Sequence, residues 1–224
     1  MGCTVRPKFD LRLLPPSPTL DFEQELWQRN FSTIAGLDEA GRGALAGPLY
    51  AAAVILPENK TSFLLERLSG VRDSKQLSAK KREEAESMIK STALAWGIGV
   101  CSAAEIDDFG MAKAGRLVFA RALESLPVAP DYLLIDYFRL PAHKIPQTAL
   151  VKGDARSLSI ACASILAKTA RDAVMRELDQ HYPVYGFAVN KGYGTRTHRH
   201  FLLECGTCPE HRQSFRLFKI PPHS

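Results

Sequence analysis

The sequence predicts an α/β domain built on a mixed five-stranded sheet flanked by helices. Three strand-like apolar segments lie in the first half of the chain, and in the second half strand-like segments alternate with helical ones. That order is typical of domains in which parallel and antiparallel strands share one sheet. The chain has 224 residues, 46% of them hydrophobic. It is therefore long enough to bury one sizeable core.

Residues 1–30 are expected to form an irregular N-terminal arm. Three prolines lie close together at positions 15–18, and a short helix that would end near Trp27 follows them. The main domain is expected to span residues 31–182. Residues 183–224 are expected to form a small helical segment that packs on that domain.

The first three strands are indicated by short apolar runs. Residues 33–37 and 49–56 form the first two, and the second is rich in alanine and branched side chains. A charged amphipathic helix at 78–90 follows, with Ser78 as its N-cap. Residues 93–101 give the third strand.

Helices and strands alternate in the second half. Residues 103–126 have helical spacing, but Gly110 and Gly115 should break the segment into two helices. Residues 132–135 form a continuously apolar strand that ends on Asp136.

The last predicted strand is 147–151, and Lys152-Gly153-Asp154 follows it. The longest helix should cover residues 157–181. A short helix near 198–204 lies in the aromatic and basic C-terminal segment.

Charge and cysteine usage limit the class of protein. A net charge of +5 favours a polyanionic partner. No apolar run is long enough to span a bilayer, and no secretory signal opens the chain, so no membrane contact is expected. The five cysteines are scattered, which indicates reduced thiols in a cytoplasm. Cys205 and Cys208 form a single CxxC without the second pair that a zinc site would need.

The most informative motif is GLDEAGRG, residues 36–43. Asp38 and Glu39 are adjacent, and neighbouring side chains of a strand point to opposite faces. The two acids can therefore share a site only if the strand stops and the backbone turns there. Gly41 and Gly43 permit a turn and a close approach of main-chain N–H groups to a ligand. The motif alone also fits an exposed charged loop.

Two further acids stand out. Asp136 ends an apolar strand, where ligands of α/β sheets usually bind, although Asp is also common in ordinary turns. Asp172 lies on the apolar stripe of the longest helix, together with Ala161 and Ile165. A carboxylate buried there needs a cation, for which Lys168 is one turn away. A surface salt bridge to Lys168 or Arg176 is the alternative.

Oxygen ligands of this kind suit Mg²⁺ or Mn²⁺. Two such ions about 4 Å apart activate a water and stabilise the leaving oxygen of a phosphodiester. The sequence alone does not show that Asp38, Glu39, Asp136 and Asp172 converge.

Several motifs in the same order resemble those of ribonuclease HII, the type 2 ribonuclease H family. They are GLDEAGRG followed by GPLYAAAVIL, then RDSKQLS, KGDARSLSIACASILAKTARD, KGYGTRTH and PEHRQSF. The likeness covers residues 34–215. Two positions depart from the usual pattern: Tyr137 stands where a small residue is commoner, and Cys208 replaces a commoner serine. Neither departure removes a functional side chain, but Tyr137 is large enough to crowd the site.

The resemblance implies that residues 31–182 form a catalytic domain with a ribonuclease H-like fold and that residues 183–224 bind substrate. It implies a two-ion metal site made by Asp38, Glu39, Asp136 and Asp172. It implies that the Gly41-Arg42-Gly43 loop reads a ribonucleotide 2′-hydroxyl, the group that distinguishes RNA from DNA. It also implies that Tyr193 packs on the sugar of the next deoxynucleotide. As an isolated residue, Tyr193 also fits a core position.

Basic residues of the matched motifs are expected to contact phosphates. They are Lys75, Lys152, Lys168 and Lys191. Solvated surface lysine is the alternative for at least one of them. His198 and His211 are left out of the catalytic set, because histidines in basic surroundings more often contact phosphate or pack in a core.

The resemblance thus predicts a monomeric, metal-dependent endoribonuclease. Its substrates would be RNA/DNA hybrids and duplex DNA with single embedded ribonucleotides. It would cut on the 5′ side of a ribonucleotide and leave 3′-hydroxyl and 5′-phosphate ends. Alternatives are another two-metal nuclease of the same fold and a catalytically silent hybrid-binding module. Residues 213–218 faintly resemble a sliding-clamp peptide, but the closing segment of the family explains them better.

Overall fold

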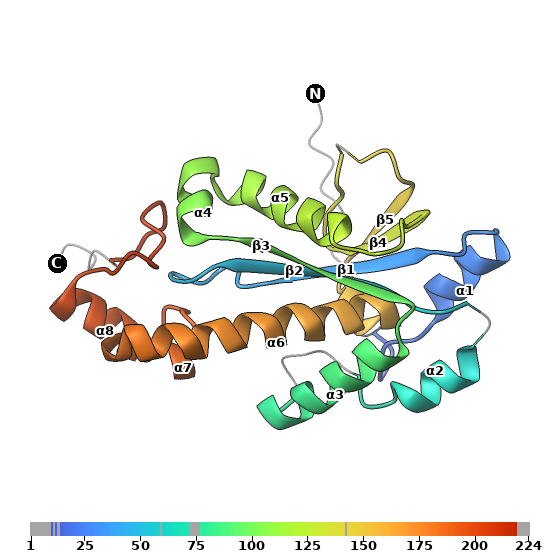
Figure 1. Ribbon diagram of the computed structural model, residues 1–224, viewed down its shortest axis with the longest axis horizontal. Helices are drawn as coiled ribbons and strands as arrows, with labels where there is room; N and C mark the ends of the chain where they lie inside the picture. Colours follow the sequence, from blue (N-terminus) through green and yellow to red (C-terminus); the bar gives the residue numbers. More distant parts are fainter. Residues whose placement is uncertain are drawn as a thin grey trace.

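A mixed five-stranded sheet forms the centre of the molecule (Figure 1). The computed structural model describes residues 10, 12, 14–58, 60–71, 77–141 and 143–218. The strands are β1 (Ile34–Ala40), β2 (Leu49–Ile55), β3 (Ala95–Cys101), β4 (Tyr132–Asp136) and β5 (Gln147–Leu150), in the spatial order β3-β2-β1-β4-β5. The first three pair antiparallel, whereas β4 and β5 continue the sheet in parallel with β1. The predicted fold class is confirmed.

Helices cover both faces of the sheet (Figure 1). In chain order, the helices of the described residues are α1 (Asp21–Gln28), α2 (Thr61–Arg67), α3 (Ala79–Thr92), α4 (Ala103–Phe109), α5 (Met111–Glu124), α6 (Leu158–His181), α7 (Phe187–Asn190) and α8 (Arg196–Cys205), with 3-10 turns at Gly153–Ala155 and Pro183–Tyr185. The long helix α6 crosses one face together with α3, and α4 and α5 cover the other. No helix among the described residues could cross a bilayer.

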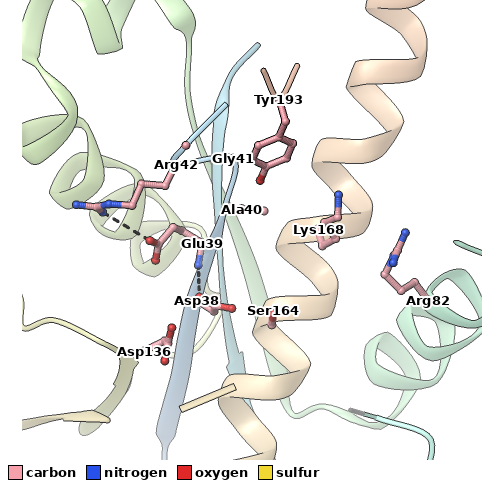
Figure 2. A pocket seen from close by; sticks show the side chains of 11 residues that line it. Asp38, Glu39, Ala40, Gly41, Arg42, Arg82, Asp136, Ser164, Lys168 and Tyr193 are labelled. Atoms are coloured by element: carbon pink, nitrogen blue, oxygen red, sulfur yellow. Dashed lines mark hydrogen bonds and ion pairs between the residues drawn. The ribbon is translucent and has the colours of Figure 1, made fainter. Parts of the chain in front are cut away.

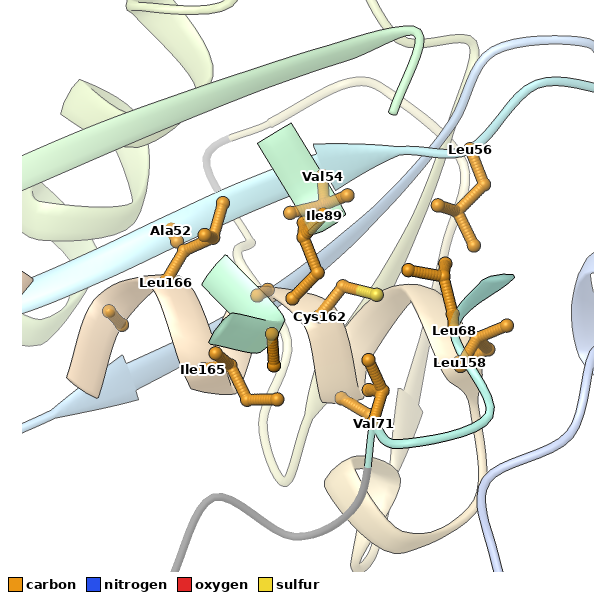
Figure 3. Packing of buried hydrophobic residues seen from close by; sticks show 14 of the residues in the cluster. Ala52, Val54, Leu56, Leu68, Val71, Ile89, Leu158, Cys162, Ile165 and Leu166 are labelled. Carbon is orange, nitrogen blue, oxygen red and sulfur yellow. The ribbon is translucent and has the colours of Figure 1, made fainter. Parts of the chain in front are cut away.

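Two apolar cores result, one on each face of the sheet. On the α6 face, Val54 of β2 packs with Ile165 and Leu166 of α6 and Ile89 of α3 (Figure 3). Gly36 lets β1 approach α6 closely, because a Cβ there would overlap the backbone of Ser159. This contact places the end of β1 directly beside α6.

Most of the predicted helix boundaries are confirmed. The Ser78 hydroxyl caps α3 by accepting from the Lys81 N–H, and Gly110, at φ +74°, separates α4 from α5. The predicted break at Gly115 is wrong, because Gly115 is a buried position inside α5. A Cβ on Gly115 would lie 3.2 Å from Nη1 of Arg42, so this glycine makes room for the arginine. The helix α2 was not predicted.

The described part of the N-terminal arm packs on the domain through α1, which agrees with the short helix predicted near Trp27. Glu23 is buried at the start of α6. Its Oε1 accepts from the hydroxyls of Ser157 and Ser159, each at 2.6 Å. An acceptor at a helix N-terminus satisfies donors that the helix itself leaves unpaired.

The C-terminal segment folds back onto the end of α6. A further apolar core forms between this segment and α6, and it includes Met175, Phe187 and Leu202. We call it the C-terminal core. The clamp-like residues 213–218 also contact the domain. The N–H groups of Gln213 and Ser214 donate to Asp107, and Leu217 is buried.

Candidate active site

A cavity of about 580 Å³ opens where β1 and β4 end (Figure 2). Strand register brings the two ends together, because Leu37 pairs with Ile135 and the next residues are Asp38 and Asp136. The lining residues are Asp38, Glu39, Ala40, Gly41, Arg42, Gly43, Arg82, Asp136, Ser164, Lys168 and Tyr193. The carboxyl ends of adjacent parallel strands are a common location for ligand sites.

The expectation that the strand stops at Asp38 and Glu39 is wrong. Strand β1 continues to Ala40 and still pairs with β2 there. Both acids nevertheless reach one cavity, because β4 ends at Asp136 and leaves the other edge of β1 open beyond Asp38. An open edge replaces the predicted turn.

Asp38 is the most deeply buried of the three acids that line the cavity, with 6% of its surface exposed. Burial raises the pKa of Asp38 well above its usual value, and the nearby charges of Asp136 and Glu39 raise it further. A hydrogen bond from the Ser164 hydroxyl opposes this rise of the pKa. The main-chain N–H of Glu39 also donates to Oδ1 of Asp38, at 2.7 Å. Like charges held this close need a cation or a proton between them.

Glu39 is oriented by Arg42. Nη1 of Arg42 lies 3.5 Å from Oε1 of Glu39, and its guanidinium carbon is 5.4 Å from the ring centre of Phe138. Burial still raises the pKa of Glu39, with Arg42 acting in the opposite direction. Arg42 is therefore directed toward an acid of the cavity.

Asp154 is the acid that the sequence did not single out. It is 5% exposed, and its charge contributes to the raised pKa of Asp38. Lys152, at φ +58°, turns the chain after β5, and the Gly153 N–H then donates to Oδ1 of Asp136 at 2.7 Å. Asp154 follows a strand that pairs in parallel with β4. The strand-end rule that selected Asp136 applies to it as well.

Asp172 lies elsewhere. Its Oδ1 is 2.5 Å from Nζ of Lys168, and its Oδ2 is 3.5 Å from Nη2 of Arg82. It is eight residues along α6 from Ser164, a rise of about 12 Å. Among the described residues that line the cavity, neither Asp172 nor Asp154 is present, but only Asp154 is close enough to contribute to the raised pKa of Asp38. The predicted cation Lys168 is thus present, whereas Arg176 pairs with Glu83.

Within the described residues, no three histidine, cysteine or acidic side chains are already close enough together to coordinate one ion. The donor chemistry nevertheless fits a hard divalent cation. Asp38, Glu39, Asp136 and Asp154 provide carboxylate oxygens at one end of the sheet. Burial raises the pKa of Asp38, and the charges of the other three acids raise it further.

The glycine loop after β1 is held by a buried arginine. Gly41 has φ +98°, and a Cβ there would overlap the side chain of Arg171. Arg171 is fully buried and donates to the carbonyls of Pro48, Lys191 and Ala46 at 2.9, 2.9 and 3.1 Å. Arg171 therefore fixes the loop against the KGYGT segment.

Tyr193 lines the cavity with 38% of its surface exposed, so it is not a simple core residue. The Arg171 guanidinium carbon lies 5.4 Å from its ring centre. Tyr137 is 70% exposed at φ +69° and is not among the lining residues that the structure describes, so the crowding expected from it is not seen.

The predicted phosphate-binding lysines differ in their surroundings. Lys168 lines the cavity, Lys152 is exposed at the turn after β5, and Lys191 donates from Nζ to the Ala188 carbonyl at 2.7 Å. Lys75 lies outside the described residues. Arg82, which the sequence did not single out, lines the cavity beside Lys168.

Comparison with known proteins identifies the family of this chain. The model of the ribonuclease HII family matches residues 35–218. A ribonuclease HII of Desulfitobacterium hafniense strain Y51 is 50% identical over 193 residues, which cover 86% of this chain and 72% of that protein. A ribonuclease HII of Chloroflexus aggregans is 49% identical over 203 residues, which cover 89% and 94%.

Among solved structures, ribonuclease H2 from Pyrococcus horikoshii OT3 superposes with a TM-score of 0.70 at 26% identity. The match covers 83% of this chain and 94% of that one. The predicted ribonuclease H-like fold and the resemblance noted from the motifs are both confirmed. This chain belongs to the ribonuclease HII family and is a ribonuclease H.

Proposed function

We propose that this chain is a metal-dependent endonuclease that cuts on the 5′ side of ribonucleotides, both in RNA/DNA hybrids and at single ribonucleotides in duplex DNA. The products would carry 3′-hydroxyl and 5′-phosphate ends. One observation carries the proposal: the cavity that holds Asp38, Glu39 and Asp136 is also lined by the Gly41–Gly43 loop and Tyr193. Such cleavage would begin the removal of ribonucleotides from DNA.

Asp38, Glu39, Asp136 and Asp154 are the residues that would hold two divalent ions, Mg²⁺ or Mn²⁺. When bound, such ions supply a water of lowered pKa and charge neutralisation at the leaving oxygen. The protein contributes the geometry. The Gly153 N–H orients Asp136, and the Glu39 N–H and the Ser164 hydroxyl orient Asp38. These hydrogen bonds keep the carboxylate oxygens in place.

Recognition of the ribonucleotide would come from the glycine loop and Tyr193. Main-chain groups of Gly41 and Gly43 can approach a sugar closely, because no side chain stands in the way. The exposed ring of Tyr193 offers an apolar surface for a deoxyribose, which has no 2′-hydroxyl to accommodate. The two readers lie in one cavity, so one nucleotide step can satisfy both.

Arg82 and Lys168 would bind the phosphates next to the scissile bond. Both line the cavity and both contact Asp172, which is 4% exposed. The Asp172 carboxylate contacts both cations and limits the motion of two long side chains. We therefore propose Asp172 as a residue that orients these cations, and Asp154 as the fourth metal-binding carboxylate.

Cleavage-site mapping tests the function. Three duplexes of equal length would carry no ribonucleotide, one ribonucleotide, or a long RNA strand, with Mg²⁺ or Mn²⁺ as the added ion. We expect no cleavage of the first and 5′-side cleavage of the other two. Binding without cleavage with either ion would indicate the silent hybrid-binding module instead. Cleavage of the all-DNA duplex would indicate a different nuclease of the same fold.

A pair of substitutions separates the roles of Asp154 and Asp172. Asp154→Asn should abolish most cleavage at saturating substrate, because a charged metal ligand is lost. Asp172→Asn should keep most of the maximal rate and raise KM, because Arg82 and Lys168 lose the carboxylate that orients them. Steady-state kinetics on one hybrid measures both. The reverse pattern would restore the metal-binding role that the sequence predicts for Asp172.

Lys191 is expected to contribute electrostatic affinity. Lys191→Ala should weaken binding to all duplexes similarly and reduce the slope of log affinity against log salt by about one unit. Fluorescence anisotropy from low to moderate salt measures the slope. An unchanged slope would show that Lys191 binds no phosphate and that its Nζ stays on the Ala188 carbonyl when the wild-type protein binds a duplex.

A further inference from the structure

Two buried histidines connect the backbone of Tyr193 to the backbone of Cys208 in the C-terminal segment. Nδ1 of His198 lies 3.0 Å from the Tyr193 carbonyl, and Nε2 of His198 lies 3.0 Å from Nε2 of His211. Nδ1 of His211 accepts from the Cys208 N–H at 3.0 Å. The two imidazoles are 0% and 1% exposed. We call this series of hydrogen bonds the histidine chain.

The ends of the histidine chain determine its protonation. The Cys208 N–H can only donate, so Nδ1 of His211 carries no proton and its Nε2 does. That Nε2–H must donate to an unprotonated Nε2 of His198, whose own proton then lies on Nδ1. The Tyr193 carbonyl can only accept, and it receives this proton. Both rings are therefore neutral, and an added proton would place two donors face to face.

The surroundings agree with neutral rings. Burial lowers the pKa of both histidines, that of His211 to about 4. The rings of Tyr185 and Phe187 pack against the pair. The Tyr193 carbonyl also accepts from the Thr195 N–H at 2.7 Å, so the peptide after Tyr193 is held by two donors.

The other end of the histidine chain is fixed to the glycine loop. His211 forms an isolated antiparallel bridge with Ala46, and the Gly47 N–H donates to the Glu210 carbonyl at 2.8 Å. Ala46 and Gly47 lie three and four residues after Gly43, in the segment that leads into β2. The histidine chain therefore joins the segment after the Gly41–Gly43 loop to Tyr193.

We propose that the His198–His211 pair positions Tyr193 relative to the Gly41–Gly43 loop and thereby sets the preference for a deoxynucleotide after the ribonucleotide. The inference rests on the function proposed above. The histidines are positioning residues, because they act through Tyr193 and the loop and are both buried.

Kinetics on two duplexes tests the proposal. The junction ratio is kcat/KM on the single-ribonucleotide duplex divided by kcat/KM on the long-RNA hybrid, where no deoxy sugar follows most cleavage sites. A misplaced contact of about 1 Å costs up to about 100-fold in rate. His198→Leu should lower the junction ratio at least about 10-fold. His198→Asn should restore most of the ratio, because its amide N–H can replace Nδ1–H toward Tyr193.

Leu202→Ala is the matched control. Leu202 is buried in the same helix α8 and in the same C-terminal core, and its side chain has no hydrogen-bonding group. Its truncation should lower the melting temperature as His198→Leu does, yet leave the junction ratio unchanged. Equal ratios for His198→Leu, His198→Asn and Leu202→Ala would reduce the histidines to core packing and overturn the inference.

Tyr193→Ala, measured in parallel, separates the two proposals. If it lowers the junction ratio while His198→Leu does not, the inference fails and the proposed function stands. If Tyr193→Ala leaves the ratio unchanged, the sugar-reading role is wrong and the inference fails with it.

Nitrogen-15 NMR of the imidazoles in the wild-type protein tests the proposed protonation of the histidine chain, and it does so even if a variant does not fold. We expect a protonated Nδ1 on His198, a protonated Nε2 on His211 and a scalar coupling across the Nε2–Nε2 hydrogen bond at neutral pH. The opposite tautomers, or a charged ring, would overturn the proposal.

Discussion

Asp136→Asn should lower cleavage by several orders of magnitude while binding of the hybrid persists. The substitution keeps the shape of the side chain, and its amide oxygen can still accept from the Gly153 N–H. It removes one negative charge from the set of oxygens that would hold the divalent ions. Turnover measured at saturating Mg²⁺ should therefore fall, whereas the affinity for the hybrid measured without the ion should stay near that of the wild-type protein.

The same substitution should affect the free protein in the opposite direction. Asp136 raises the pKa of Asp38 by like-charge repulsion, so its neutralisation should bring that pKa closer to the ordinary value. The free energy of unfolding measured without metal should stay constant or rise. Asp108→Asn, at an exposed position of α4, is the control and should change neither property. Near-normal turnover of Asp136→Asn would remove Asp136 from the site.

The strand-end acids could be predicted from the sequence for a physical reason. Apolar runs indicate buried strands, and carboxyl ends of parallel strands meet at one edge of a sheet. Asp136 follows such a run. Asp154 follows β5, whose side chains are mostly half-buried. The sequence of β5 is therefore less apolar than that of β4, and it does not mark the acid after it as a strand-end residue. The burial of Asp154 depends on the turn at Lys152, which local sequence does not determine.

Helical periodicity correctly placed Asp172 on a buried stripe but could not identify its partners. Lys168 is one turn away on the same helix, whereas Arg82 comes from α3, ninety positions earlier. Which acids converge therefore depends on how α3 and α6 pack. The histidine chain also depends on tertiary packing, because His211 reaches His198 only when the C-terminal segment pairs with the residues around Ala46.

Tyr193→Ala should lower cleavage of a single-ribonucleotide duplex steeply, by about 100-fold, because the apolar surface that registers the next sugar is lost. Metal binding should survive, since Tyr193 is no ligand. The fold should also survive, because main-chain hydrogen bonds to Asn190 and Thr195 hold the segment independently of the ring. Tyr182→Ala is the control. Tyr182 is a partly buried tyrosine that packs against the C-terminal core, and its loss should leave cleavage of the single-ribonucleotide duplex unchanged.

Tyr193→Phe distinguishes the ring from the hydroxyl. A mild effect would show that packing of the ring on the sugar is sufficient, and a loss as large as that of alanine would show that the hydroxyl orients the scissile phosphate. The duplexes without a ribonucleotide, with one, and with a long RNA strand give the decisive comparison. A single 2′-hydroxyl followed by one deoxy sugar satisfies both readers, so the wild-type protein should cut that duplex at its 5′ side. If it ignores that duplex yet cuts long RNA in hybrids, the two readers do not act together, and a specificity of the type 1 kind replaces the one proposed.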